Sequence, residues 1–169
     1  MDVQNCILSR RSIRKYTNQE IDQSTTEQLL IAAMHAPSAR NQQAWHFIVI
    51  EKRNQLDALA DAHPYAKMLK SAPLAIAVCA DLSMEKSKDM WVQDCAAATQ
   101  NILLRAHSLS LGAVWLGVFP REERIMSIGS VLELPDHIVP ISLISIGHPD
   151  ESPEPTDRFC TDRIHYNSW

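Results

Sequence analysis

A chain of 169 residues with 46% hydrophobic and 21% charged residues has the size and composition of a single globular domain. Its formal net charge of −4 argues against a general nucleic-acid-binding protein, because such proteins usually carry a clear excess of basic residues. An anionic ligand would therefore have to bind at a local cluster of positive charge.

Targeting and membrane segments are not expected. The N-terminus lacks the pattern of a signal peptide, and no apolar run approaches the ~20 residues that span a bilayer. The cysteines are widely spaced and form no CxxC pair, so we expect reduced thiols in a cytoplasmic protein. They are Cys6, Cys79, Cys95 and Cys160.

Several chemical motifs are also missing. None of the four glycines belongs to a GxGxxG or GxxxxGK[ST] motif, which excludes a Rossmann dinucleotide turn and a P-loop. There is no GxSxG nucleophile elbow, and the seven histidines show no metal-ligand spacing, so no metal site is expected. In a redox enzyme of this sequence, a nicotinamide would be at most a transient substrate.

The first part of the chain predicts two helices and a strand. Residues 3–8 form a short apolar helix or turn that leads into a basic segment. Ser24 and Glu27 suit a capping box, and residues 25–35 follow with apolar side chains at helical spacing until Pro37 stops the helix. A polar loop then leads to a strand over residues 45–50, which is rich in aromatic and β-branched side chains.

The middle and end of the chain alternate between helices and strands. In chain order we expect helices over 52–62 and 65–71, a strand over 74–80, a helix over 89–109, a strand over 113–118, a helix over 121–128 and a strand over 138–146. The apolar run 74–80 indicates a strand buried on both faces, and 89–109 indicates a central buried helix with Gly112 as its C′ residue. The pattern predicts one mixed α/β or α+β domain over residues 1–169.

The tail from residue 149 to 169 is too polar to fold alone. It nevertheless ends in Ile164, Tyr166 and Trp169, so we expect it to dock onto the body of the chain or onto a second copy.

Four segments have residues suited to ligand chemistry. The first, residues 9–16, concentrates arginines and hydroxyls that suit phosphate and carbonyl groups. The second, 36–45, offers Ser, Asn and Gln side chains to a heteroaromatic ring. The third, 114–118, has Gly117 inside a strand, where something can approach the backbone closely. The fourth is the tail, where Arg158 or Arg163 would complete a phosphate site. Taken singly, each has an ordinary alternative: a solvated patch, a loop, a packed strand or a surface salt bridge.

Read in order, the four segments resemble the nitroreductase family of flavin-dependent NAD(P)H oxidoreductases. The family's opening motif, Arg-x-Ser-x-Arg/Lys, is similar to Arg10-Arg11-Ser12-Ile13-Arg14. Its second motif, Pro-Ser-x-x-Asn-x-Gln-Pro-Trp, resembles residues 37–45, with Ala44 in place of the second proline. The Trp-Leu-Gly motif is intact at 115–117, and the tail resembles the Arg-Phe…His-Tyr…Trp ending of short members. The resemblance covers nearly the whole chain.

The resemblance implies an α+β fold with a central mixed sheet of four to five strands flanked by helices, and a tail, 149–169, that extends onto the partner subunit. It also implies a homodimer with one FMN in each of two pockets between the subunits. One chain would hold the phosphate, ribityl chain and pyrimidine edge, and the partner chain would reach the flavin from the loop after residue 36. The cofactor-binding residues so implied are Arg10, Arg11, Ser12, Arg14, Pro37, Ser38, Ala39, Asn41, Gln43, Leu116, Gly117, Arg158 and Arg163.

The implied activity is hydride transfer from NADH or NADPH through flavin N5 to a nitroaromatic, a quinone or a similar acceptor, by a ping-pong mechanism. No catalytic nucleophile is required, and Arg14 would favour the anionic reduced flavin electrostatically. Two alternatives remain: a specialised flavin reaction such as reductive dehalogenation or enone reduction, and a non-catalytic protein that binds or senses FMN. The small residues 95–99 would support the dimer, unless that surface is buried in the chain's own core, and residues 63–71 and 83–91 would form the substrate lid.

Overall fold

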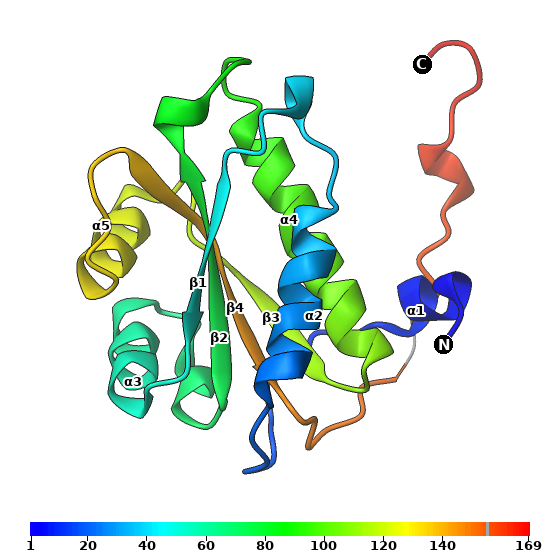
Figure 1. Ribbon diagram of the computed structural model, residues 1–169. Coiled ribbons are helices and arrows are strands. Elements are labelled where there is room, and N and C mark those ends of the chain that lie inside the picture. Colours follow the sequence, from blue (N-terminus) through cyan, green and yellow to red (C-terminus); the bar gives the residue numbers. More distant parts are fainter. Residues whose placement is uncertain (155) are drawn as a thin grey trace.

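The computed structural model describes residues 1–154 and 156–169. Its centre is an antiparallel sheet in the strand order β1-β2-β4-β3 (Figure 1). The strands are β1 (Trp45–Ile50), β2 (Leu74–Asp81), β3 (Gly112–Gly117) and β4 (Ile138–Gly147). Each agrees with its expected range to within one residue.

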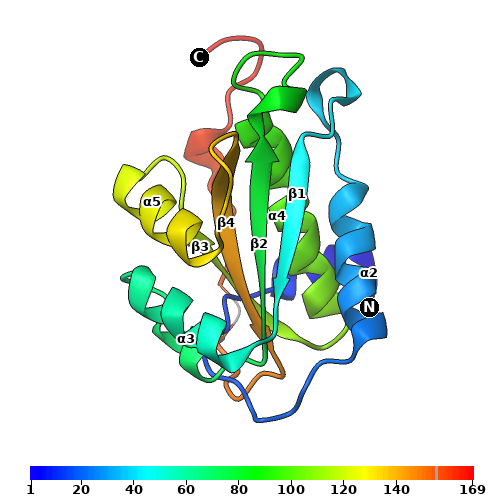
Figure 2. The same ribbon diagram turned by 60° about the vertical axis from the view of Figure 1, so that its left-hand side comes forward.

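Helices cover both faces of the sheet. On one face lie α2 (Gln23–Met34) and α4 (Trp91–Ser108), and on the other lie α3 (Arg53–Ala62) and α5 (Glu122–Val131), as Figures 1 and 2 show. The short helix α1 (Val3–Ser9) stands at the side of α4. Single 3-10 turns complete the structure: η1 (Ala39–Asn41), η2 (Lys67–Lys70), η3 (Leu82–Met84) and η4 (Thr161–Arg163).

Strand β2 divides the core into two apolar layers. Leu74, Ile76 and Val78 pack toward α2 and α4, whereas Ala75, Ala77 and Cys79 pack toward α3 and α5. All six side chains are buried, so the expectation of a strand buried on both faces is confirmed. Burial raises the pKa of the Cys79 thiol to about 12, and this thiol is therefore protonated and unreactive at neutral pH.

The sheet is antiparallel, whereas a mixed sheet was expected. Alternating helices and strands suggest parallel pairing, and α4 does carry the chain from β2 to a strand, β3, that runs in the same direction. However, β4 returns between them and pairs antiparallel with both. Within the described residues, parallel pairing is limited to the isolated bridge between Ser12 and Ala113.

Two expected helix ends are wrong. Helix α2 begins earlier than the expected capping box at Ser24, because the side chain of Asp22 accepts a hydrogen bond from Thr25 N at 2.7 Å and so caps the helix. Helix α4 ends at Ser108, and Ser110 takes the left-handed conformation, with φ of 62°, that was expected at Gly112. Gly112 instead opens β3.

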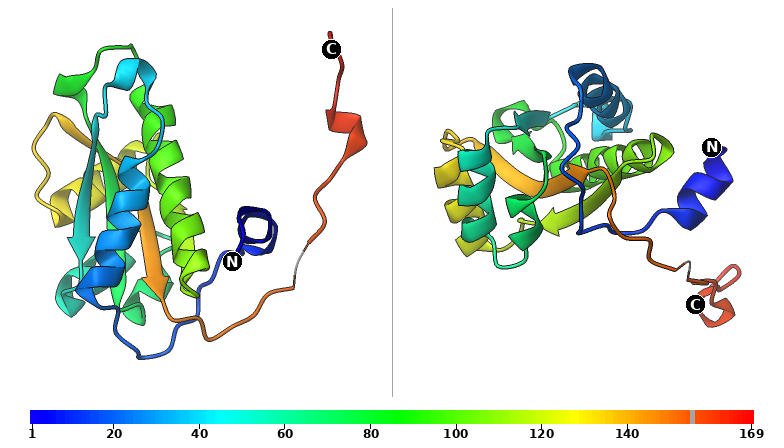
Figure 3. Two further views of the ribbon diagram at one scale, coloured as in Figure 1. Left: turned by 45° about the vertical axis from the view of Figure 1, so that its right-hand side comes forward. Right: turned by 90° about the horizontal axis from the view of Figure 1, so that it is seen from below.

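Helix α1 and the C-terminal tail extend away from the layered body (Figure 3). The side chains of Phe159, Tyr166 and Trp169 are 77%, 82% and 100% exposed, so these apolar groups do not dock onto the chain's own body. In the described part of the chain, no helix has the length and apolarity to cross a membrane.

Candidate functional site

The basic segment is fixed to the edge of the sheet by two buried side chains. Ile13 N donates to Ala113 O at 3.1 Å, and Tyr16 Oη donates to Ile13 O at 2.7 Å. The segment approaches closely because Gly112 and Gly147 have no side chains. A Cβ at Gly112 would lie 2.6 Å from Ile13, and one at Gly147 would lie 2.7 Å from the Tyr16 ring. The packing therefore sets which way the remaining residues of the segment face.

Three arginines gather beside this segment. Burial lowers the pKa of Arg10 from its ordinary value, and the nearby charges of Arg158 and Arg11 lower it further, which places both cations close to Arg10. Among the described residues, none of the three forms a salt bridge. We call Arg10, Arg11 and Arg158 the basic cluster. It concentrates uncompensated positive charge in a chain that is acidic overall.

The basic cluster brings together the start and the end of the chain. Arg11 Nε donates to Glu154 O at 3.2 Å, and Arg14 N donates to Glu151 Oε1 at 2.5 Å, so the tail is held beside the basic segment where it leaves the body. Arg163 lies farther along, in η4, and is exposed. The structure therefore places Arg158, and not Arg163, with the arginines of the N-terminal motif.

A cavity of about 560 Å³ opens on β3, and we call it the β3 cavity. Its size suits a small organic ligand. It unites Arg14 with Leu116 and Gly117 of the predicted set, and a Cβ added at Gly117 would meet no atom within 4 Å. The space in front of this strand is therefore open. Its lining residues are Arg14, His63, Pro64, Tyr65, Lys67, Met68, Val114, Trp115, Leu116, Gly117 and Arg124.

The carbonyl oxygen of Gly117 accepts two side-chain hydrogen bonds. His63 Nε2 is 3.0 Å away and Arg124 Nη1 is 2.8 Å away. His63 Nδ1 accepts from Tyr65 N at 3.2 Å, which leaves Nε2 as the protonated nitrogen of a neutral ring. Burial lowers the pKa of His63, and the charge of Arg124 lowers it further. His63 was expected only as the first residue of the lid segment 63–71, and Arg124 was not expected at the site, because only the fold brings them to the same oxygen.

The loop of the second motif lies elsewhere and does not line the β3 cavity. It has a constrained shape, since Arg40, Asn41 and Gln43 have φ of 50°, 52° and 49°, in the left-handed region. Gln43 N donates to Ser38 Oγ at 3.2 Å across the turn. Pro37, Ser38, Ala39, Asn41 and Gln43 are therefore grouped together, but within one chain they are separate from Arg14 and Gly117.

Two buried residues that sequence reasoning missed hold this loop in place. Asp94 Oδ1 accepts from Ala39 N at 3.0 Å, and its Oδ2 accepts from Gln42 Nε2 at 2.6 Å. Gln42 Oε1 in turn accepts from the backbone N of Lys86 at 2.9 Å and of Ser87 at 3.1 Å. The expected lid segment 83–91 is thus tied to the second motif, whereas 63–71 supplies residues to the β3 cavity.

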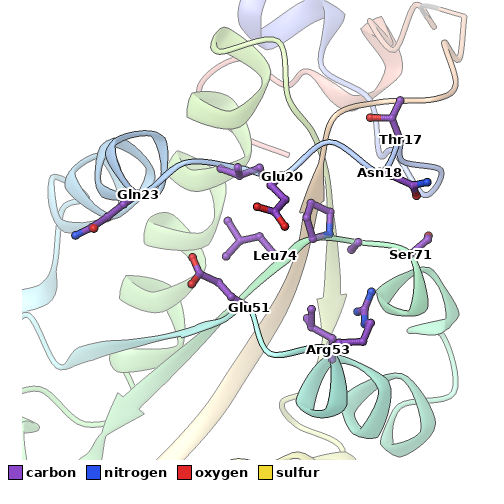
Figure 4. A pocket seen from close by; sticks show the side chains of 12 residues that line it. Thr17, Asn18, Glu20, Gln23, Glu51, Arg53, Ser71 and Leu74 are labelled. Carbon is purple, nitrogen blue, oxygen red and sulfur yellow. The ribbon is translucent and has the colours of Figure 1, made fainter.

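A second cavity of about 580 Å³ lies at the other end of the sheet, between β1, β2 and the segment before α2 (Figure 4). The carboxylates of Glu20 and Glu51 point into it (Figure 4). Arg53 also lines it, but Arg53 Nε pairs with Asp57 at 3.3 Å. None of the predicted cofactor residues lines this cavity, and its carboxylates suit an anionic ligand poorly. The β3 cavity is therefore the better candidate site.

Comparison with known proteins identifies the family of the chain. The sequence profile described as the Nitroreductase family matches residues 7–63 and 61–148, which include the basic segment, the second motif and β3. The chain belongs to the nitroreductase family. Both the expected family and the expected α+β nitroreductase-like fold are confirmed.

Other nitroreductases match over almost their whole length. A relative from Methanothermobacter thermautotrophicus, with the provisional name NADH dehydrogenase/NAD(P)H nitroreductase, is 49% identical over 100% of this chain and 88% of that protein. An FMN-dependent nitroreductase from Clostridium difficile is 31% identical, with a TM-score of 0.92 over 99% of this chain and 100% of that one. A nitroreductase from Desulfovibrio desulfuricans, solved in complex with FMN, is 30% identical, with a TM-score of 0.86 over 100% and 98%.

Proposed function

We propose that this nitroreductase binds FMN and transfers hydride from NADH or NADPH to nitroaromatic, quinone or similar acceptors. The observation that carries the proposal is the pairing of two features in one fold. An uncompensated basic cluster suits a phosphate, and nearby Arg14 and Gly117 share an open cavity. The family membership and the FMN complex of the Desulfovibrio relative support the same assignment.

The residues present fit FMN. Arg10, Arg11 and Arg158 would hold the phosphate, and the half-buried Ser12 beside them would bind the ribityl chain. Leu116 and Gly117 would lie along the isoalloxazine ring, for which the absent side chain of Gly117 leaves room. Arg163 would reach the phosphate only if the tail follows a different path from the one described.

Bound flavin would supply the redox chemistry by accepting hydride at N5 and passing it on. Arg14 would place a positive charge at the pyrimidine edge, where negative charge develops on reduction. His63 and Arg124 fix the peptide plane of Gly117 through its carbonyl oxygen. Because donor and acceptor would use the same cavity in turn, the proposed kinetic order is ping-pong.

We further propose that the working unit is a homodimer. The second-motif loop lies apart from the β3 cavity, so Pro37, Ser38, Ala39, Asn41 and Gln43 would contact the flavin of the other subunit. The exposed apolar side chains of the tail would cover that subunit. Part of the small-residue patch is unavailable for this contact, because Cys95, Ala98 and Thr99 are buried in the chain's own core, which leaves Ala96 and Ala97. The four free thiols favour a reducing compartment such as the cytoplasm.

Flavin absorbance tests the proposal. The purified protein should be yellow, with one FMN per chain. Its flavin bands should bleach when NADH or NADPH is added without oxygen, and should return when a quinone or nitroarene follows. FMN that stays oxidised for many minutes with both nucleotides would contradict the enzyme and leave a protein that only binds flavin. Bleaching without recovery by quinones or nitroarenes would point to a specialised acceptor.

A further inference from the structure

One cation of the β3 cavity has no part in the flavin contacts proposed above. Arg124, in the first turn of α5, is half-buried and lines the cavity. Its Nη1 donates to Gly117 O, and its guanidinium carbon lies 5.3 Å from the centroid of the Tyr65 ring. A guanidinium carries five N–H donors. The bond to Gly117 engages Nη1, and Arg124 forms no salt bridge with any of the described residues.

The charged side chains that line the cavity all have the same sign. Arg14, Lys67 and Arg124 line the cavity, and no aspartate or glutamate is among its lining residues in the described chain. Burial lowers the pKa of His63, which favours the uncharged ring, and Nε2 donates to Gly117 O while Nδ1 accepts from Tyr65 N. A recess lined by one sign of charge concentrates ligands of the opposite sign, even though the whole chain carries a net charge of −4.

Tyr65 supplies an aromatic surface at the same place. Its side chain is 66% exposed, and its ring contacts His63 edge to face, with the centroids 6.1 Å apart. Its other neighbour is the guanidinium of Arg124, which holds the ring through a cation–π contact. The cavity mouth therefore presents a ring and a cation side by side.

We propose that Tyr65 and Arg124 form a subsite for an aromatic electron acceptor that carries a negative charge. Arg124 binds a carboxylate or sulfonate on the acceptor, and Tyr65 packs against its ring. The physiological acceptor is then an anionic quinone or nitroarene in preference to a neutral one. This inference rests on the proposed function, because it takes the β3 cavity as the place where acceptor and cofactor meet.

A purely structural role for Arg124, holding Gly117, would affect all acceptors equally. The test therefore measures the ratio of the rate constants for a negatively charged and a neutral acceptor. FMN-loaded protein is reduced with light and EDTA, without NAD(P)H, and mixed without oxygen with 4-nitrobenzoate or with neutral 4-nitrobenzamide. The return of flavin absorbance gives a second-order rate constant for each acceptor. Effects on folding, on Gly117 or on the flavin's potential cancel in the ratio of the two constants.

We expect Arg124→Gln to lower the benzoate-to-benzamide ratio about tenfold, which corresponds to about 1.4 kcal/mol of lost binding to the carboxylate. Arg124→Lys should keep most of the preference, because the charge remains. The matched control is Arg121→Gln, an exposed arginine at the start of the same helix that does not line the cavity, and its ratio should equal that of the wild type. A ratio unchanged in Arg124→Gln, or lowered as much in Arg121→Gln, overturns the proposal.

Two further measurements protect the test. Tyr65→Leu should slow both nitroarenes and leave ferricyanide, which has no ring, unaffected; equal rates for all three acceptors in Tyr65→Leu and wild type would remove Tyr65 from the subsite. In the wild-type protein, added salt should slow the reaction with 4-nitrobenzoate but not the reaction with 4-nitrobenzamide. This measurement does not depend on the folding of any variant. Since light replaces NAD(P)H, a failure of nucleotide oxidation would count against the proposed function without altering this ratio.

Discussion

Glycines with different surroundings are a sensitive probe of the site. Gly147 and Gly112 leave room for the side chains of Tyr16 and Ile13, which pack against them. At Gly117 and Gly129, by contrast, an added Cβ would have no atom within 4 Å. None of them has positive φ. Their roles therefore depend on what occupies the space beside them and not on backbone conformation, so alanine substitutions should separate packing from ligand binding.

Gly147→Ala should destabilise the fold by about 1–3 kcal/mol, because the new methyl group would overlap the Tyr16 ring. Gly129→Ala, in the last turn of α5, should stabilise it by up to about 1 kcal/mol through helix propensity. Gly117→Ala should leave the free energy of unfolding of the FMN-free chain almost unchanged but weaken FMN binding. Urea denaturation and FMN titration measure both effects, and tight FMN binding by Gly117→Ala would contradict the proposed ring position.

His63 should make stability depend on pH. Its pKa in the folded chain is lowered from 6.5 by burial, and the charge of Arg124 acts in the same direction. As the pH falls below about 6.5, the unfolded chain takes up a proton at His63 before the folded chain does, so the free energy of unfolding decreases.

The measurement compares the pH dependence of unfolding from pH 7.5 to 5 in wild type and in His63→Gln. The variant cannot bind this proton and should lose less stability over the interval, whatever its stability at pH 7.5. The exposed His137→Gln serves as the control and should follow the wild type. Parallel curves for His63→Gln and wild type would show that His63 titrates alike in both states.

At the level of elements, the second-motif loop depends on helix α4. Asp94 accepts hydrogen bonds from Ala39 N and Gln42 Nε2, and Gln42 extends the connection to the backbone of residues 86 and 87. Three loop residues have left-handed φ although they are not glycine. Such a conformation persists only when the surroundings determine it, and this buried network provides that constraint.

Asp94→Ala should destabilise the protein by about 2–4 kcal/mol, because it leaves the buried Gln42 Nε2 and the part-buried Ala39 N without acceptors. It should also weaken FMN binding, since the loop would lose its shape. Asp94→Asn keeps one acceptor oxygen and should be intermediate, while Gln93→Ala, exposed on the same helix, should change neither property. Urea denaturation with FMN titration decides the matter: full stability in Asp94→Ala would show that the loop holds its shape without the carboxylate.

Helices and strands were predictable from the sequence where a pattern among neighbouring residues indicates them. Strands such as 45–50 combine β-branched and aromatic residues over a short stretch, and the periodicity of α4 extends over many turns. What the sequence could not show are contacts between distant residues. Asp94 lies 52 residues from Gln42, and His63 lies 54 residues from Gly117. The role of Gly112 was missed for the same reason, because Ile13, the residue that packs against it, lies far away in the sequence near the N-terminus.

The candidate site was predictable only in part. The motifs identified both the basic cluster and the edge of the β3 cavity, because guanidinium groups and a glycine within a strand have recognisable chemistry. Tyr65 and Arg124 have no motif of their own and become meaningful only when the segment after α3 and helix α5 are placed beside β3. The antiparallel order of the sheet was likewise hidden, since it depends on β4 returning between β2 and β3.

At the scale of the whole molecule, we propose two separate tasks for the tail. Arg158 belongs to the basic cluster, whereas Phe159, Tyr166 and Trp169 present exposed apolar surface in the described chain. A set of exposed aromatic side chains on an extended segment favours contact with another protein surface. The proposed second copy would supply that surface.

The two tasks should separate by mutation. Replacing Phe159, Tyr166 and Trp169 together with serine should weaken the dimer, which light scattering would detect as a shift from twice 19.0 kDa toward 19.0 kDa. Arg158→Ala should keep the dimer mass and weaken FMN binding. A wild-type chain that is monomeric with FMN bound would contradict the shared site, and an unaltered dimer in the triple variant would remove the tail from the interface.

The attachment of the basic segment also determines how the molecule opens. Ile13 N, Thr17 N and Asp150 N donate to Ala113, His148 and Lys15, so one ladder joins the segment, both neighbouring strand ends and the root of the tail. These amide protons should exchange with solvent together, as one cooperative unit, and more slowly than those of α1, a short helix that packs against α4. Separating that unit would draw Arg10 and Arg11 away from Arg158. If these arginines hold the FMN phosphate as proposed, we expect FMN to dissociate no faster than this local opening allows.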